Sequence, residues 1–63
     1  MDNFSARLRH LRTKAGLSIS ELASIAKLPR QTIHRLERGE RQPTLDTAHR
    51  LAKALRVSLS AFD

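Results

Sequence analysis

The sequence predicts an all-α fold, a compact single domain over residues 1–63 with four helices and a fifth short one. Apolar residues recur at the spacing of an amphipathic helix, and no stretch shows the clean alternation that is typical of a strand. Glycine and proline separate the helical blocks, as turn residues do. A chain of this length hides only about 60% of the surface that it exposes when unfolded, so we expect a small core.

The first two predicted helices span residues 3–15 and 19–26. The first carries an apolar stripe made of Phe4, Leu8, Leu11 and Ala15, and Gly16 follows it in the usual C-terminal position. The second starts after Ser18, because Ser18 and Glu21 have the spacing of a capping box, in which each side chain satisfies a free backbone N–H. Pro29 interrupts this block, since proline disfavours helix at the preceding residue.

The third predicted helix, residues 30–38, has two different sides. At about 100° per residue, Ile33, Leu36 and Glu37 fall on one side of it. The opposite side consists of Gln31, His34, Arg35 and Arg38, with Arg30 on the flank. Two aliphatic residues therefore anchor a helix whose other side is almost wholly basic or amide.

The last two predicted helices span residues 44–55 and 58–62. Thr44 is the expected N-cap of the longer one, with Asp46 favourably placed in its first turn. Its apolar stripe consists of Leu45, Ala48, Leu51, Ala52 and Leu55. Ser58 could cap the short last helix, with Leu59 and Phe62 facing inward.

The charge of the chain indicates a polyanionic partner. Twelve Lys and Arg residues against six Asp and Glu residues leave a net charge of +6, which predicts nucleic acid or an acidic membrane surface. The only aromatic residues are Phe4 and Phe62, which argues against base stacking on single strands. The longest apolar run is too short to span a membrane or to form a signal peptide, so we expect a cytoplasmic protein.

Nothing in the sequence favours an enzyme, a metal or a cofactor. There is no cysteine, and the three histidines, His10, His34 and His49, lack metal-ligand spacing. No arrangement of Ser, His and Asp indicates a catalytic triad. We therefore expect no catalytic residues, no metal and no cofactor.

The second and third predicted helices form a helix-turn-helix pattern. They are short, a few residues join them, and the small Ala23 allows a close crossing. Such a pair holds its second helix out from the body, where it can enter the major groove of duplex DNA. A basic helix face is often only a solvated surface, but in this context Arg30, Gln31, His34 and Arg35 become candidates for base recognition. Arginine pairs bidentately with guanine, and glutamine with adenine.

The sequence also resembles the phage repressor and Cro-type helix-turn-helix family, of the xenobiotic-response-element type, over about residues 8–62. The matching segments are Gly16-Leu17-Ser18, Glu21-Leu22-Ala23, Ile33, Leu36-Glu37-Arg38-Gly39, Pro43 and Leu51-Ala52-Lys53-Ala54-Leu55. The resemblance implies a five-helix, lambda-repressor-like domain that binds operator DNA as a dimer. It implies a small bacterial or phage transcription regulator, repressor-like, located at the nucleoid or encoded by a phage.

Carried over by position, the resemblance implies roles for individual residues. Arg30, Gln31 and Arg35 would contact bases, with His34 as a fourth candidate. Phosphate contacts would come from Arg12, Ser18, Ile19, Arg38, Arg41 and Gln42, those at the start of the second helix through free backbone N–H groups. Arg12 and Glu37 match a pair that forms a salt bridge in relatives.

The chain departs from the family pattern at three positions. Lys27 stands where the family usually has glycine in the turn, so lysine must tolerate a left-handed backbone or the turn must differ. Pro29 replaces the usual Ser or Thr cap of the third helix, and such a cap is typically worth about 1 kcal/mol. Arg56 stands where glycine often follows the fourth helix.

The expected partners are double-stranded DNA and a second copy of the chain. One short recognition helix covers few base pairs, and Val57, Leu59 and Phe62 offer an apolar patch for a homodimer. An alternative is an antitoxin or a partner-recruiting module that acts through another protein and whose DNA binding serves autoregulation. An amphipathic membrane-surface protein is a poor fit, because the basic residues occupy several helices without Trp or a large apolar face.

Overall fold

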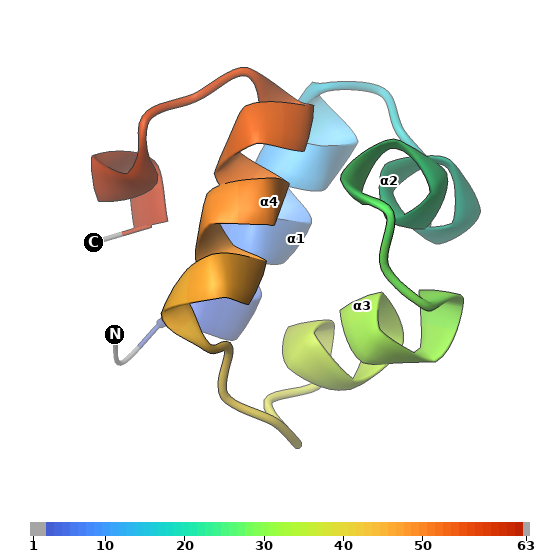
Figure 1. Ribbon diagram of the computed structural model, residues 1–63, viewed down its shortest axis with the longest axis vertical. Coiled ribbons are helices and arrows are strands. Elements are labelled where there is room, and N and C mark those ends of the chain that lie inside the picture. The colour runs from blue at the N-terminus through green and yellow to red at the C-terminus, as the bar shows by residue number, and fades with distance from the viewer. Residues whose placement is uncertain (1–2, 63) are drawn as a thin grey trace.

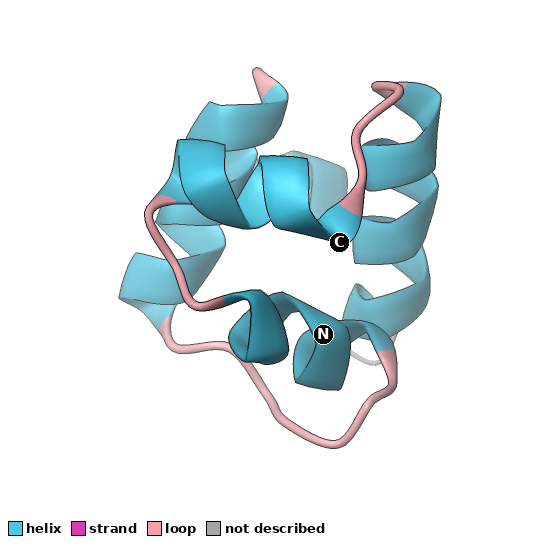
Figure 2. Ribbon diagram, turned by 90° about the vertical axis from the view of Figure 1, so that its right-hand side faces the viewer, coloured by secondary structure: helices cyan, strands magenta, loops and turns pink. Residues whose placement is uncertain are grey.

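The computed structural model describes residues 3–62, and its secondary-structure elements are all helices joined by short loops (Figures 1 and 2). The elements are α1 (Phe4–Lys14), α2 (Ile19–Ala26), α3 (Arg30–Glu37), α4 (Leu45–Leu55) and the 3-10 helix η1 (Leu59–Phe62). No strand occurs between residues 3 and 62. The prediction of an all-α fold is therefore confirmed, and each α-helix begins and ends within a residue of its expected bounds.

The expected count of five helices is not confirmed, because the described residues form four α-helices and one 3-10 helix. The last segment is only four residues long, and the backbone N–H of Ala61 donates to Ser58 O at 3.0 Å, an i to i+3 bond. A segment of this length makes a tight 3-10 turn rather than a run of i to i+4 bonds.

Local hydrogen bonds at the helix starts follow the predicted caps. Ser18 Oγ accepts from the backbone N–H of Glu21 at 3.0 Å, and the Ser18 N–H donates to Glu21 Oε1 at 2.8 Å. This capping box lowers the pKa of the Glu21 carboxyl, because the Ser18 N–H stabilises the charged form. Thr44 Oγ1 accepts from the Thr47 N–H at 3.1 Å, whereas Pro29 starts α3 without a side-chain cap.

Two helices end on cationic residues in a left-handed conformation. Lys27 follows α2 and Arg56 follows α4, both at φ 58°. Gly16 and Gly39 also have positive φ, but they lack the Cβ that makes this region unfavourable. At the lysine the backbone N–H of Leu28 donates to Ala23 O at 2.9 Å, which satisfies a carbonyl at the end of α2. The turn therefore keeps the geometry that glycine would favour, with lysine in its place.

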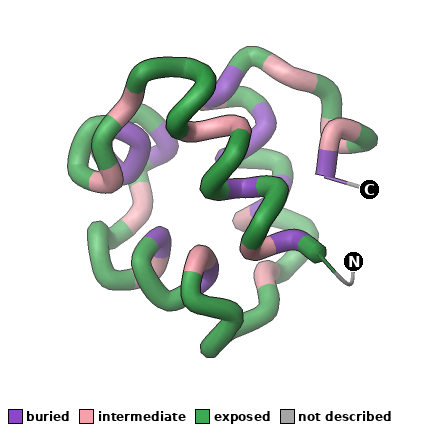
Figure 3. The backbone as a smooth tube through the Cα atoms, turned by 180° about the vertical axis from the view of Figure 1, so that it is seen from behind, coloured by how far each residue is buried: buried purple, intermediate pink, exposed green. Residues whose placement is uncertain are grey.

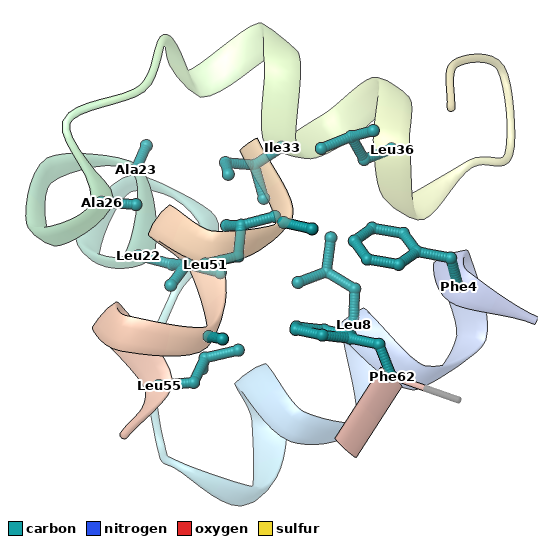
Figure 4. Close-up of a cluster of buried hydrophobic side chains, with 12 residues drawn as sticks. Phe4, Leu8, Leu22, Ala23, Ala26, Ile33, Leu36, Leu51, Leu55 and Phe62 are labelled. Atoms are coloured by element: carbon teal, nitrogen blue, oxygen red, sulfur yellow. The ribbon is translucent and has the colours of Figure 1, made fainter. Parts of the chain in front are cut away.

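One apolar core joins all five elements (Figure 4). Buried positions alternate with exposed ones along each helix, so the helices turn their apolar stripes toward one another (Figure 3). The side chains with the least exposure are Leu8, Leu22, Ile33, Leu36, Leu51 and Phe62. No helix in residues 3–62 is long and apolar enough to cross a membrane.

The placement of Phe62 corrects one expectation from the sequence. Its side chain is 1% exposed and its ring lies 4.8 Å from that of Phe4, centroid to centroid. A ring buried against α1 has no surface left for a second subunit, so Phe62 is a core residue and not a dimer contact. Val57 and Leu59 are partly buried and pack against the same core.

Candidate nucleic-acid interface

The helix α3 has one buried side and one side open to solvent. Ile33 and Leu36 point from α3 into the core (Figure 4). The exposed residues of the helix are Arg30, Gln31, His34 and Arg35, and Arg38 follows at its C-cap. Packing against α1 and α2 fixes the buried side. A helix of eight residues is about 12 Å long, so its exposed polar groups form a short, dense patch.

An ion pair between α1 and α3 fixes the orientation of α3. Arg12 Nε donates to Glu37 Oε2 at 2.6 Å and Arg12 Nη2 donates to Glu37 Oε1 at 3.0 Å, a bidentate arrangement. Arg12 Nη1 donates to the carbonyl oxygen of Leu17 at 2.8 Å, which adds the loop between α1 and α2. The side chains of Arg12 and Glu37 are 12% and 6% exposed. The hydrogen bonds that Arg12 donates to the Glu37 carboxylate raise the pKa of Arg12, so the guanidinium stays charged.

These contacts use most of the hydrogen-bonding capacity of Arg12. A guanidinium has five N–H donors, and three of them point to Glu37 and Leu17. Arg12 was expected both to form a salt bridge and to contact a phosphate. Its bonds in the structure mainly hold α1, α3 and the loop after α1 together. Any phosphate contact from Arg12 has to use the donors that remain.

Two of the other candidate arginines also have partners. Arg30 Nε donates to Ser20 Oγ at 2.9 Å, which joins the first turn of α3 to α2. Arg38 Nε lies 2.9 Å from Glu40 Oε2, and both side chains are exposed. In contrast, no side-chain hydrogen bond within residues 3–62 involves Gln31, His34 or Arg35. On α3, these three side chains can therefore contact a ligand with all of their hydrogen-bonding groups.

The N-terminus of α2 and the loop after α3 lie on either side of this patch in the chain. At Ser18 the capping box occupies the Ser18 N–H, while the N–H groups of Ile19 and Ser20 belong to the first turn and have no intrahelical partner. Arg41 and Gln42 are exposed in the loop between α3 and α4. Both places offer donors suited to an anion.

A family model described as helix-turn-helix matches residues 8–62. The chain belongs to the helix-turn-helix family. It is 46% identical over 48 residues to an HTH-type transcriptional regulator of Methanothermobacter thermautotrophicus, a match covering 76% of this chain and 70% of that protein. It is 42% identical over 53 residues to an HTH-type transcriptional regulatory protein of Pyrococcus abyssi, with 84% of this chain covered. The match spans only 17% of the Pyrococcus protein.

Two solved structures show the same arrangement of helices. The crystal structure of the restriction-modification controller protein C.AhdI from Aeromonas hydrophila aligns with a TM-score of 0.94 at 38% identity, over 97% of this chain and 92% of that one. An HTH_3 family transcriptional regulator from Vibrio cholerae aligns with a TM-score of 0.92 at 33% identity, over 95% of this chain and 34% of that one. In this helix-turn-helix chain, α2 and α3 are consecutive helices that pack against each other and are joined by a short turn (Figure 1).

The structure adds Arg9 to the residues of the helix-turn-helix chain that surround α3. A hollow of about 210 Å³ is lined by Arg9, Arg12, Ile19, His34, Glu37 and Arg38, which come from α1, α2, α3 and the residue after α3. Arg9 was not among the residues that the sequence predicted for the site. Its spacing of three residues from Arg12 was the available signal, because i and i+3 share a helix face.

Proposed function

We propose that the chain is a sequence-specific, duplex-DNA-binding transcription regulator that places α3 in the major groove. The observation that carries this proposal is the two-sided α3, held by Ile33 and Leu36 inside and by the Arg12–Glu37 pair at its end, with its polar side in solvent. The major groove is about 12 Å wide and presents a distinct donor and acceptor pattern for each base pair. A short rigid helix with arginine and glutamine on its open side suits that groove.

The base-reading residues in this proposal are Arg30, Gln31, His34 and Arg35. Gln31, His34 and Arg35 are the strongest candidates, because within residues 3–62 no internal side-chain hydrogen bond holds them. Arg30 donates only Nε to Ser20, so its terminal N–H groups remain available for a base while the bond to α2 holds the side chain in place. Recognition of guanine by arginine and of adenine by glutamine would make the protein selective for its half-site.

The phosphate contacts in this proposal lie on both sides of α3. On one side are the free N–H group of Ile19 and the hydroxyl of Ser18 at the start of α2, together with Arg9 and the remaining donors of Arg12. On the other side are Arg38, Arg41 and Gln42. Such contacts supply affinity without sequence information and make binding salt-dependent.

We further propose that two copies bind a palindromic operator. One helix of eight residues covers few base pairs, and a two-fold dimer would read half-sites about 34 Å apart, one turn of DNA. Val57 and Leu59 are the apolar contact residues in this proposal. The similar controller protein and transcription regulators support regulation of transcription as the outcome. Action on genomic duplex DNA implies the cytoplasm, at the nucleoid.

Selection of bound sequences from a random duplex pool tests this proposal. We expect a short inverted repeat with its half-sites about one helical turn apart. Recovery of unselected sequence would contradict specific recognition. Recovery of a single half-site, together with a monomer by sedimentation on that DNA, would contradict the dimer.

A further inference from the structure

A second hollow, of about 570 Å³, lies between the ends of α2 and α4. Four cationic residues line it, namely Lys27, Arg50, Lys53 and Arg56. Its other lining residues are Ile25, Ala26 and Ala54. No residue of α3 contributes to it, so the hollow belongs to a different surface from the proposed DNA-binding face.

The charge of this hollow is of one sign. It has no carboxylate in its lining. Arg50 Nε pairs with Asp46 Oδ2 at 3.0 Å, outside the lining, and the other three cations have no ion pair within residues 3–62. Cations near helix C-termini also interact favourably with the helix dipole. That effect accounts for the positions of Lys27, Lys53 and Arg56, but it accounts neither for Arg50 in the middle of α4 nor for the apolar residue that also lines the hollow.

That apolar residue is Ile25, whose side chain is exposed. It is 53% exposed and is one of only two large exposed hydrophobic residues in the described part of the chain. The partly buried Ala54 adds to the apolar surface of the hollow, whereas Ala26 is 4% exposed and belongs to the core. A hollow lined by an exposed isoleucine and four cations offers both an apolar contact and charge complementarity to a suitable ligand.

The backbone at the rim of the hollow supports a role for its cations. Lys27 and Arg56 are the two residues other than glycine with positive φ in the described part of the chain, and both line this hollow. A side chain in this conformation costs about 1 kcal/mol relative to glycine. Glycine at either position would relieve the strain and would also remove a cation from the rim.

We propose that this hollow binds an acidic segment of a partner protein, with an aliphatic or aromatic side chain of that segment on Ile25 and its carboxylates on the surrounding cations. Duplex DNA would satisfy the cations, but its phosphates leave Ile25 without an apolar contact. A second copy packed symmetrically through this face would bring like charges together. An acidic segment with an apolar side chain uses every group of the hollow.

A nuclear magnetic resonance titration of the ¹⁵N-labelled chain tests the proposal with two probes. One probe is a capped octapeptide of glutamates with two leucines, and the other has serines in place of the leucines. We expect the leucine probe to shift the amide signals of Ile25, Lys27, Lys53 and Arg56, and to bind more tightly than the serine probe. Shifts centred on α3, equal affinity of the two probes, or no binding at millimolar concentration would each overturn the proposal.

Matched variants separate this hollow from general charge. Lys53 and Lys14 are both exposed and both lie in the last turn of an α-helix, so Lys53→Glu and Lys14→Glu make the same change in the same setting. We expect Lys53→Glu to weaken the leucine probe about threefold to tenfold more than Lys14→Glu, as reversal of one exposed charge among several implies. Equal effects of the two variants would refute a specific site.

Two further measurements decide between the occupants. Ile25→Ser should weaken the leucine probe and leave the serine probe unchanged, with circular dichroism confirming the fold. A selected operator duplex should shift the amides of α3 and not those of the hollow, and Lys53→Glu should bind it as Lys14→Glu does. Operator-induced shifts in the hollow would assign it to DNA instead. If the leucine probe did not bind while the operator still did, the proposal for the hollow would be rejected and the proposed DNA binding would stand.

Discussion

Removal of the carboxylate of Glu37 should destabilise the domain and loosen α3. Glu37→Gln keeps the size of the side chain but leaves the guanidinium of Arg12 with an amide that can accept and cannot balance its charge. Breaking a fully buried ion pair costs about 3–5 kcal/mol. Hollows of about 210 and 460 Å³ border Glu37, so water can reach the exposed end of the broken pair. Arg12 also keeps its bond to Leu17. We therefore expect a loss of about 2 kcal/mol, between the values for buried and exposed pairs.

Thermal unfolding measures this loss directly. At about 4–8 °C per kcal/mol for a domain of this size, the midpoint should fall by roughly 8–16 °C. A double-mutant cycle with Arg12→Met isolates the pair, and the double variant should be less destabilised than the sum of the two single variants. The ion pair would have no role in stability if the two effects simply added, within about 0.3–0.5 kcal/mol. The operator affinity of Glu37→Gln, measured at a temperature where this variant remains folded, then shows how far DNA binding by α3 depends on the Arg12–Glu37 pair.

Other changes test the site and the turns. Arg35→Ala should weaken operator binding by about 1–3 kcal/mol and relax preference at one base position; equal loss on random DNA, measured by competition, would contradict base reading. Arg38→Ala should weaken all duplexes alike and lower the salt slope by about one; an unchanged slope would exclude a phosphate contact. Lys27→Gly should raise the free energy of unfolding by about 0.5–1 kcal/mol by relieving the left-handed strain, whereas Lys14→Gly, at the last residue of α1 where the backbone is still helical, should lower it by up to about 1 kcal/mol. For Glu21 the folded pKa lies below its ordinary value of 4.5, so its stabilisation is present above that value and is lost as pH falls through the folded pKa. Chemical unfolding should show the free energy of unfolding falling between neutral and acidic pH. In Glu21→Gln this fall should be smaller, because the variant lacks the carboxyl that titrates.

The helix boundaries could be predicted because short-range interactions set them. Ser18 and Glu21 are three residues apart, and Thr44 and Thr47 likewise, so their caps form within single turns. The buried side of α3 followed from the spacing of Ile33 and Leu36. At Lys27 the sequence left two outcomes, a left-handed lysine or a different turn. The backbone at φ 58° decides between them, since the bonds that end α2 require that conformation.

Contacts between distant residues could not be predicted from the residues alone. Helical spacing placed Leu59 and Phe62 on an inward side, but it could not say whether that side meets the core or a second subunit. The ring of Phe4, far away in the sequence, covers Phe62 and decides the question. The bond from Arg30 to Ser20 and the hollow that Arg9 and His34 both line likewise depend on how the helices cross.

The sequence by itself determined the all-α class, the helix-turn-helix order of its elements and the polar composition of α3. Periodicity and capping act over one or two turns of a helix, so residues close together in the sequence are enough to predict these features. The tertiary structure decided which charges are free to bind a partner. Of the six acidic residues, Glu37 neutralises Arg12 across 25 positions, while the cations of the hollow between α2 and α4 meet no carboxylate in its lining. A net charge is a sum over composition, whereas a binding surface depends on which side chains the packing of helices brings together.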